Sequence, residues 1–310
     1  MKQLNSETIN IMQNTNKILM IRPVGFTYNA ETAGNNLFQV AGNAVNAQEK
    51  ALKEFDAFVE LLRKNDIDVT VIDDTPEPHT PDSIFPNNWI SFHENNTAIL
   101  YPMYAENRRA ERKQHVKDFV SKGFNKNNLI DFSDFEKENF FLEGTGSMVL
   151  DRENRIAYAC ISPRTNKEVL NIFCEKMGYA PCTFEATDEN GNQIYHTNVM
   201  MCVADKFVVI CLDAITNEEE RKQVIKTISQ TSKEIISISL KQMNCFAGNM
   251  LQLQNMKGEK LLVMSQQAFQ SLTPGQITSL EKYNQLVYSN LETIETNGGG
   301  SARCMIAEIF

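Results

Sequence analysis

The feature that most constrains the fold is a unit in which an apolar strand is followed closely by the start of a helix. The unit recurs five times, with strands centred at Met20, Leu100, Tyr158, Val209 and Val263. Most of the apolar runs contain about five residues, the usual length of a strand. The spacing between units is irregular, which excludes a solenoid of fixed period. Two α/β architectures remain, a closed ring of similar units and a doubly wound sheet.

Helical periodicity is clearest over residues 44–64, where apolar side chains recur at steps of three and four. Further helices are expected at about 108–121, 166–177, 218–231 and 277–284, and strands at 18–22, 69–72, 98–101, 156–160, 208–211 and 261–264. No linker separates these elements. We therefore expect one catalytic domain over residues 1–310, in which the polar residues 1–16 form a flexible N-terminal segment.

Charge and hydropathy limit the partners of the chain. A formal net charge of −9 argues against general nucleic-acid binding, which uses basic patches. The most apolar runs, such as 206–212, are far shorter than the roughly 18 residues of a membrane span. The N-terminus lacks the apolar core of a secretory signal. We expect a cytoplasmic protein that binds a small molecule and neither membrane nor nucleic acid; a homo-oligomer is left open.

The sequence predicts no metal and no other cofactor. Its seven cysteines are odd in number and contain no CxxC pair, so most are expected to be reduced core thiols, as at Cys160 and Cys211. With four histidines and no HExxH, a dedicated transition-metal site is not expected. No GxGxxG follows the first strand and no GxxxxGK[ST] loop is present, so nucleotide binding is not supported.

The C-terminus contains a run of three glycines, residues 298–300, shortly before Cys304. Three consecutive glycines are costly to order unless the backbone needs a positive φ or a group must approach it closely. One interpretation is a plain turn into a C-terminal strand, with Cys304 as a small buried hydrophobe. The other is a nucleophilic thiol.

A nucleophilic cysteine needs a base, and His196 has the most suggestive context of the four histidines. His79, His93 and His115 stand among charged or proline-rich neighbours and are expected at the surface. A structural role for His196 also stays open. Glu143 lies between apolar residues and glycines, so a buried carboxylate there must be paired or protonated and is a candidate to orient the histidine.

Two further groups of polar residues are candidates for substrate binding. The segment 81–90 contains Asn87 and Asn88, which indicate a loop but can also bind a planar amide-like group while staying neutral. Arg109 and Arg164 stand near helix starts that follow strands. Each is either a solvated helix-start residue or a bidentate ligand for an amino-acid carboxylate.

Together these motifs resemble the guanidine-modifying superfamily with the pentein fold, which includes arginine deiminases, dimethylarginine dimethylaminohydrolases and amidinotransferases. The motifs are Pro81-Asp82-x-x-Phe85-x-x-Asn88, Arg108-Arg109, Leu142-Glu143-Gly144, Ser162-Pro163-Arg164-Thr165-Asn166, His196-x-Asn198 and Gly298-Gly299-Gly300-x-x-x-Cys304. The resemblance implies a five-bladed α/β propeller of ββαβ units around a central active site.

The resemblance also implies roles for individual residues. Cys304, His196 and Glu143 form a catalytic triad, in which the thiol attacks the central carbon of a guanidine or ureido group and gives a covalent intermediate. Asp82 and Asn87 line the substrate pocket, and Arg109 and Arg164 bind the carboxylate or polar end of an amino acid.

The chain departs from the deiminases and dimethylarginine hydrolases at residues that pair with a guanidinium cation. Asn88 stands where both kinds of enzyme have an aspartate, and Asn198 stands where the deiminases have one. Gly-Thr-Gly-Ser follows Glu143, where Gly-Gly-Asp is usual. Loss of a buried carboxylate partner costs about 3–5 kcal/mol, which favours a neutral ureido substrate.

The residues of several motifs are similar to those of the citrulline utilization hydrolases. This resemblance implies hydrolysis of citrulline to ornithine, ammonia and carbon dioxide. The alternatives are arginine deiminase, dimethylarginine hydrolase or amidinotransferase activity. Outside the enzymes, the alternative is a binding module that keeps the pocket without the chemistry.

Overall fold

The computed structural model describes residues 11–36, 38–40, 46–123 and 128–310, and their strands form five three-stranded sheets. The sheet orders are β15-β1-β2, β3-β4-β5, β6-β7-β8, β11-β10-β9 and β12-β13-β14. The strands are β1 Lys17–Arg22, β2 Asp68–Asp73, β3 Ile90–His93, β4 Thr97–Leu100, β5 Leu129–Asp131, β6 Val149–Asp151, β7 Ile156–Cys160, β8 Ala180–Phe184, β9 Met201–Val203, β10 Phe207–Ile210, β11 Glu234–Ser237, β12 Leu251–Gln254, β13 Lys260–Ser265, β14 Gln285–Ser289 and β15 Ala307–Ile309.

The five sheets repeat one pattern. The central strands β1, β4, β7, β10 and β13 each pair antiparallel with one neighbour and parallel with the other. A parallel neighbour requires a crossover, which a helix provides in each unit. The five strand centres identified in the sequence lie on these five central strands, so the predicted repeat of ββαβ units is confirmed.

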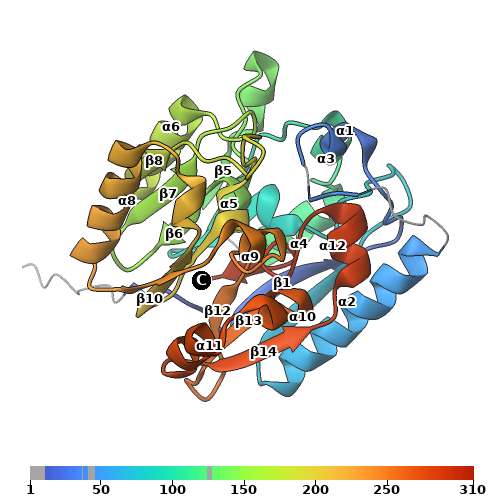
Figure 1. The fold of residues 1–310 in the computed structure, drawn as a ribbon. Coiled ribbons are helices and arrows are strands. Elements are labelled where there is room, and N and C mark those ends of the chain that lie inside the picture. The colour runs from blue at the N-terminus through green and yellow to red at the C-terminus, as the bar shows by residue number, and fades with distance from the viewer. Residues whose placement is uncertain (1–10, 37, 41–45, 124–127) are drawn as a thin grey trace, which may run out of the picture.

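The first sheet joins the two ends of the chain. The C-terminal strand β15 pairs antiparallel with β1, with Leu19 opposite Ala307. The alternative of one doubly wound sheet is therefore wrong, because the strands belong to five separate sheets and the last one completes the first. In Figure 1 helices α2, α6, α8 and α11 lie around the outside of the molecule and the strands lie inside them.

The longer helices fall close to their expected positions. They are α2 Ala47–Lys64, α6 Lys167–Met177, α8 Glu218–Gln230 and α11 Pro274–Glu281. The last begins earlier than expected because Thr273 and Gln276 form a capping box with Pro274 at the first turn. The shorter helices are α1 Ala30–Ala33, α5 Gly144–Ser147, α7 Thr197–Met200, α9 Leu240–Asn244, α10 Gln266–Ser271 and α12 Glu292–Gly298, with 3₁₀ turns at Pro86–Asn88, Ser133–Glu138 and Leu212–Ala214.

The prediction of a single helix over residues 108–121 is wrong. Two helices are present instead, α3 Glu106–Arg109 and α4 Gln114–Gly123. The chain between them is held by buried side chains: Glu111 binds Arg108, and Lys113 forms an ion pair with Asp74 at 2.7 Å. These tertiary contacts outweigh the helical propensity of the segment.

The N-terminal segment expected to be flexible includes residues 1–10, which lie outside the described residues. Within the rest of the segment, Gln13 is buried and its Nε2 donates to the backbone oxygens of Leu150 and Val203 at 2.9 and 3.1 Å. Asn14 Nδ2 donates to Gln252 Oε1 at 2.6 Å. These contacts tie the start of the described chain to the interior.

Apolar side chains from neighbouring units pack into shared clusters. Tyr158, Val209 and Met264, from three central strands, belong to one cluster, and Met20 and Val263 belong to another. Burial of this apolar surface is the main force that joins the units. None of the helices in the described ranges is both long and apolar enough to cross a membrane.

Candidate active site

Each unit contributes a polar residue to the centre of the molecule from the segment just before its first strand. Asn88 precedes β3, Glu143 precedes β6, His196 precedes β9, Asn249 precedes β12 and Cys304 precedes β15. Four of these residues were singled out in the sequence; Asn249 was not. The repeat itself would have pointed to it, because Asn249 occupies the same place in the fifth unit as the others do in theirs.

Glu143 and His196 form a buried pair. His196 Nε2 lies 2.7 Å from Glu143 Oε2, and both side chains are almost fully buried. The other carboxylate oxygen of Glu143 accepts from the backbone N–H of Tyr104 at 2.9 Å, and Arg164 Nη1 lies 3.6 Å from Oε2. The carboxylate is therefore paired, as its apolar surroundings require.

The protonation states of this pair follow from its surroundings. Burial acts to raise the pKa of Glu143, but Arg164 and the hydrogen bond with His196 outweigh it and hold the pKa below its usual value. Burial lowers the pKa of His196 against the opposing effect of Glu143. At neutral pH the glutamate is ionised and the histidine neutral, so Nε2 donates and Nδ1 carries the lone pair of a base.

Cys304 lies in the turn between α12 and β15 and is buried. Its sulfur accepts from two amides, Asn198 Nδ2 at 3.4 Å and Asn249 Nδ2 at 3.3 Å. Of the three preceding glycines, Gly299 ends α12 in the left-handed region at φ 64°, which favours glycine. Two amide donors, from Asn198 and Asn249, thus point at the sulfur of Cys304.

Asn249 is itself held in place. Its Nδ2 also donates to the backbone oxygen of Asn198 at 2.9 Å, and its Oδ1 accepts from the backbone N–H of Arg303 at 3.0 Å. Because Oδ1 is occupied by a donor, the amide presents its NH₂ group to the sulfur of Cys304.

A small pocket brings these groups together. It is lined by Thr32, Asn36, Asp82, Phe85, Asn88, Arg108, Arg164, Tyr195, His196, the three glycines 298–300 and Cys304. Asp82 Oδ2 accepts from Asn29, whereas its buried Oδ1 has no partner. Burial raises the pKa of Asp82, with Arg108 opposing the shift. A donor supplied by a ligand would satisfy this oxygen.

Two predicted site residues, Arg109 and Asn87, do not line the pocket. Arg109 does not line the pocket: it is partly exposed and donates to the backbone oxygens of Met103 and Tyr104. Its neighbour Arg108 points into the pocket instead. Asn87 is fully buried behind Asn88 and contacts Thr145, so it supports the pocket wall without lining it.

Arg108 fixes the orientation of Asn88. The guanidinium binds Glu111 through two hydrogen bonds of 2.7 and 3.0 Å, lies 3.7 Å from Asp82 and donates through Nη1 to Asn88 Oδ1 at 2.8 Å. The oxygen of Asn88 is thereby occupied, and its Nδ2 donates to Asn87 Oδ1 at 3.0 Å and lies beside Gly146.

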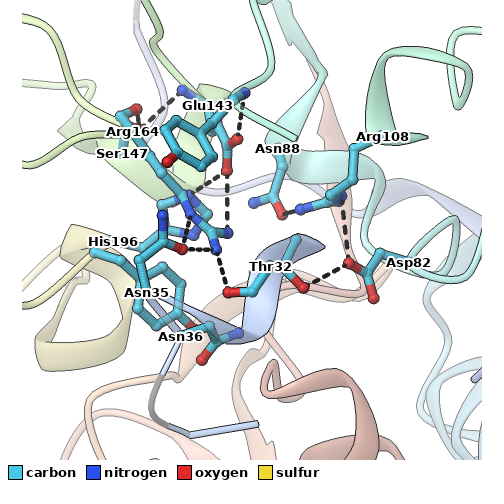
Figure 2. A network of polar contacts seen from close by, with 12 residues as sticks. Thr32, Asn35, Asn36, Asp82, Asn88, Arg108, Glu143, Ser147, Arg164 and His196 are labelled. Atoms are coloured by element: carbon cyan, nitrogen blue, oxygen red, sulfur yellow. Dashed lines mark hydrogen bonds and ion pairs between the residues drawn. The ribbon is translucent and has the colours of Figure 1, made fainter. Parts of the chain in front are cut away.

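Arg164 is covered by the segment around α1, as Figure 2 shows. Its Nη2 donates to the backbone oxygen of Thr32 at 3.1 Å, and Nε and Nη2 both donate to Asn35 Oδ1, the former at 3.0 Å. Asn36 Nδ2 donates to the backbone oxygens of Gly298 and Gly299 at 3.5 and 3.4 Å. The α1 segment thus closes the pocket over the arginine and the glycine run.

The expectation of a surface position is wrong for His93. This residue is fully buried, with Ser91 Oγ 2.7 Å from Nε2. His93 ends strand β3, and its position inside the sheet buries it despite polar neighbours in sequence. Among the described residues no group of three His, Cys, Asp or Glu side chains is arranged to hold a metal ion.

Comparison with known proteins gives the chain a family. The family described as "N,N dimethylarginine dimethylhydrolase, eukaryotic" matches residues 22–310. No curated protein matches the sequence.

Three solved structures have the same fold. The substrate-bound N-terminal domain of ArgZ, an arginine dihydrolase from the ornithine-ammonia cycle in Cyanobacteria, has a TM-score of 0.75 at 17% identity, over 94% of this chain and 97% of that one. A mutant of AgrE in complex with L-arginine has a TM-score of 0.75 at 16% identity, over 95% and 40%. A dimethylarginine dimethylaminohydrolase adduct with S-methyl-L-thiocitrulline has a TM-score of 0.64 at 15% identity, over 96% and 100%. The pentein fold is confirmed.

Proposed function

Because the chain belongs to the family described as N,N dimethylarginine dimethylhydrolase, eukaryotic, we propose that it is a cysteine-dependent hydrolase of C–N bonds in guanidino amino acids. One observation carries the proposal: His196, paired with Glu143, lines the same buried pocket as Cys304, although the three residues come from three different units. A base and a thiol at one buried site are the requirements of nucleophilic catalysis. The solved neighbours, whose names include an arginine dihydrolase and a dimethylarginine dimethylaminohydrolase, support the same substrate class.

Each member of the triad has a separate role. His196 takes the proton of the Cys304 thiol, and the sulfur attacks the guanidinium carbon to form a C–S bond and a tetrahedral intermediate. The intermediate collapses as His196 gives this proton to the leaving nitrogen, so that one C–N bond breaks and ammonia or a methylated amine departs. His196 then takes a proton from water, which attacks the same carbon and breaks the C–S bond. Glu143 keeps the imidazole oriented and stabilises its cationic form.

The remaining pocket residues bind the amino acid. Arg164 binds the carboxylate bidentately, which requires Asn35 to leave the guanidinium. Asp82 offers its unpartnered oxygen to a cationic donor of the substrate. Asn198 and Asn249 hold the sulfur of Cys304. Arg109 lies outside this set, and we assign the carboxylate to Arg164 alone.

A second substrate, citrulline, is favoured by the orientation of Asn88. Because Arg108 occupies its oxygen and Asn87 Oδ1 accepts one of its two N–H groups, Asn88 has one N–H donor left for a ligand in the pocket that it lines. A guanidinium group offers only donors there, whereas a ureido group offers a carbonyl oxygen that accepts from Asn88. The same donor stabilises the negative charge that develops on that oxygen. Hydrolysis of citrulline with one water would give ornithine, ammonia and carbon dioxide.

Product analysis tests the proposal and separates the two substrates. Purified protein is incubated separately with arginine, dimethylarginine and citrulline, and citrulline, ornithine, ammonia and methylated amines are quantified. Release of ammonia or an amine that Cys304→Ala abolishes is expected. Turnover of arginine or dimethylarginine without turnover of citrulline removes the second candidate. If none is hydrolysed but substrate still protects Cys304 from alkylation, the chain is a binding protein and the enzymatic proposal is wrong.

A further inference from the structure

Tyr195 contacts three separate parts of the pocket. Its hydroxyl donates to the backbone oxygen of Gly299 at 2.7 Å, in the glycine run that leads to Cys304. Its ring centre lies 4.7 Å from that of His196, and the guanidinium of Arg164 stands over the ring at 4.8 Å from the centroid. We call residues 298–304, the glycine run and the chain up to Cys304, the nucleophile loop. The buried side chain of Tyr195 therefore contacts this loop, the base His196 and Arg164, which we assign to the substrate carboxylate.

The position of Tyr195 is fixed from behind. Its backbone oxygen accepts from Ser162 Oγ at 2.7 Å, and Phe38 packs edge-on against its ring at 6.2 Å. Tyr195 also separates the catalytic pocket from a larger outer cavity, because it lines both. On the far side that cavity is lined by residues such as Phe246 and Gln267.

We infer that Tyr195 is a positioning residue with two separable functions. Its hydroxyl holds the nucleophile loop in position. Its ring holds the guanidinium of Arg164 in position and shields His196 from water. The inference rests on the proposed function. Two observations support the division. The hydroxyl reaches only the loop, whereas the ring contacts Arg164 on its face and His196 at an angle of 48°. A cation over a tyrosine face is attracted to it, so the ring restricts where the guanidinium can lie.

The Tyr195→Phe variant tests the hydroxyl. It keeps the ring and removes only the hydrogen bond to Gly299. We expect kcat to fall by about tenfold, because small displacements of a reacting group lower the rate strongly, while KM stays within about twofold. Tyr158→Phe is the matched control: that hydroxyl is also buried but has no hydrogen-bond partner. Equal kcat in Tyr195→Phe and Tyr158→Phe would overturn the role of the hydroxyl.

The Tyr195→Leu variant tests the ring. Relative to Tyr195→Phe, we expect KM to rise by about tenfold, because Arg164 loses the surface against which it stacks. We also expect the acidic limb of kcat/KM to move to higher pH, because water from the outer cavity reaches His196. If Tyr195 only stabilised the fold, Tyr195→Leu would lower the fraction of active protein but leave KM and the pH of the acidic limb of kcat/KM unchanged. That result would overturn the inference.

A measurement without substrate keeps this test independent of the proposed function. Nitrogen-15 NMR titration of the four histidines gives the pKa of His196 directly in the native protein, in Tyr195→Phe and in Tyr195→Leu. We expect a rise of at least about half a pH unit in Tyr195→Leu only. If the native protein hydrolyses none of the three compounds, the proposed function fails, while this titration still decides whether the ring shields His196.

Discussion

The amide nitrogen of Asn249 lies 3.3 Å from the sulfur of Cys304, a residue 55 positions later in the chain. The two belong to the turns before β12 and β15, so only the ring of units brings them together. A second amide, from Asn198, reaches the same sulfur at 3.4 Å. The thiol thus lies between two neutral donors, with no carboxylate among its hydrogen-bond partners.

This relationship predicts the effect of Asn249→Asp, which keeps the shape of the side chain but places a carboxylate against the sulfur. Alkylation of Cys304 by iodoacetamide at pH 7 should slow by about a hundredfold, since a negative charge disfavours the thiolate. Asn249→Ala, which only removes a donor, should slow it by about tenfold. The rate is measured by mass spectrometry of the Cys304 peptide. If the aspartate variant reacts as fast as the native protein, the amide does not stabilise the thiolate.

The buried histidines predict how stability depends on pH. Burial lowers the pKa of both His93 and His196 from 6.5. Below that pH the unfolded chain takes up protons that the folded chain does not, so stability falls as pH decreases. Each histidine should lower the free energy of unfolding by about 1.4 kcal/mol for each pH unit below 6.5, down to the pH at which the histidine is protonated in the folded protein.

Urea unfolding at pH 5, 6 and 7 measures this dependence. His196→Gln should flatten the curve below pH 6.5, and so should His93→Gln. Glu143 acts in the same direction at lower pH, because its pKa is held below the usual value and its contribution is lost on acidification. Unfolding free energies that stay constant from pH 7 to 5 would show that the two histidines become protonated in the folded protein.

Arg108 and Arg109 should respond very differently to substitution. Arg108 is buried, with Glu111 as its bidentate partner, whereas Arg109 is partly exposed. Arg108→Ala leaves Glu111 uncompensated and should cost about 3–5 kcal/mol of stability. Arg109→Ala should change kcat/KM by less than about threefold.

The double variant Arg108→Ala/Glu111→Gln separates folding from function in this pair. Removing the buried charge should restore most of the melting temperature, measured by thermal unfolding. Activity should stay low, because Asn88 has lost the donor that orients it. Recovery of both stability and activity in the double variant would leave Arg108 with a structural role alone.

The sequence predicted the five units because each central strand is an apolar run that can be recognised without its neighbours. It also singled out Cys304, His196 and Glu143 as candidate catalytic residues, since each stands in a context that its residue type does not ordinarily occupy. It could not separate Arg108 from Arg109. Successive residues on a helix point about 100° apart, so only the packing of the short helix α3 decides which one faces the pocket.

Asn249 and Tyr195 were missed for a different reason. An asparagine after a glycine is typical of a turn, and a tyrosine beside an apolar residue is typical of a hydrophobic core. The functions that we propose for them depend on contacts with residues 55 and 104 positions away, Cys304 and Gly299. Such contacts are set by the closure of the ring, which no local pattern records.

Asn35 should compete with the substrate for Arg164. Its Oδ1 accepts from Nε and Nη2 of the guanidinium, which are the two donors that a carboxylate would use. Asn35→Ala should therefore lower KM severalfold and leave kcat nearly unchanged. Asn36→Ala is the control, because Asn36 bonds the glycine run and not the arginine. A rise of KM in Asn35→Ala would mean that Asn35 holds the pocket together instead of blocking it.

Gly146 should be sensitive to the smallest side chain. A Cβ there would stand 2.5 Å from Asn88 Nδ2 and 2.9 Å from His196 Nδ1. Because Glu143 and Arg108 hold these two groups, the methyl group must displace one of them. Gly146→Ala should lower kcat by about a hundredfold while the protein still folds, which steady-state kinetics and a melting curve measure together. Gly178→Ala is the control for an effect on folding alone: this exposed glycine ends α6 at φ 69°, with no atom within 4 Å of an added Cβ, so the change should lower stability without changing kcat. Native kcat in Gly146→Ala would mean that Asn88 and His196 can move apart without harm, and the orientation argued for Asn88 would then not govern the reaction.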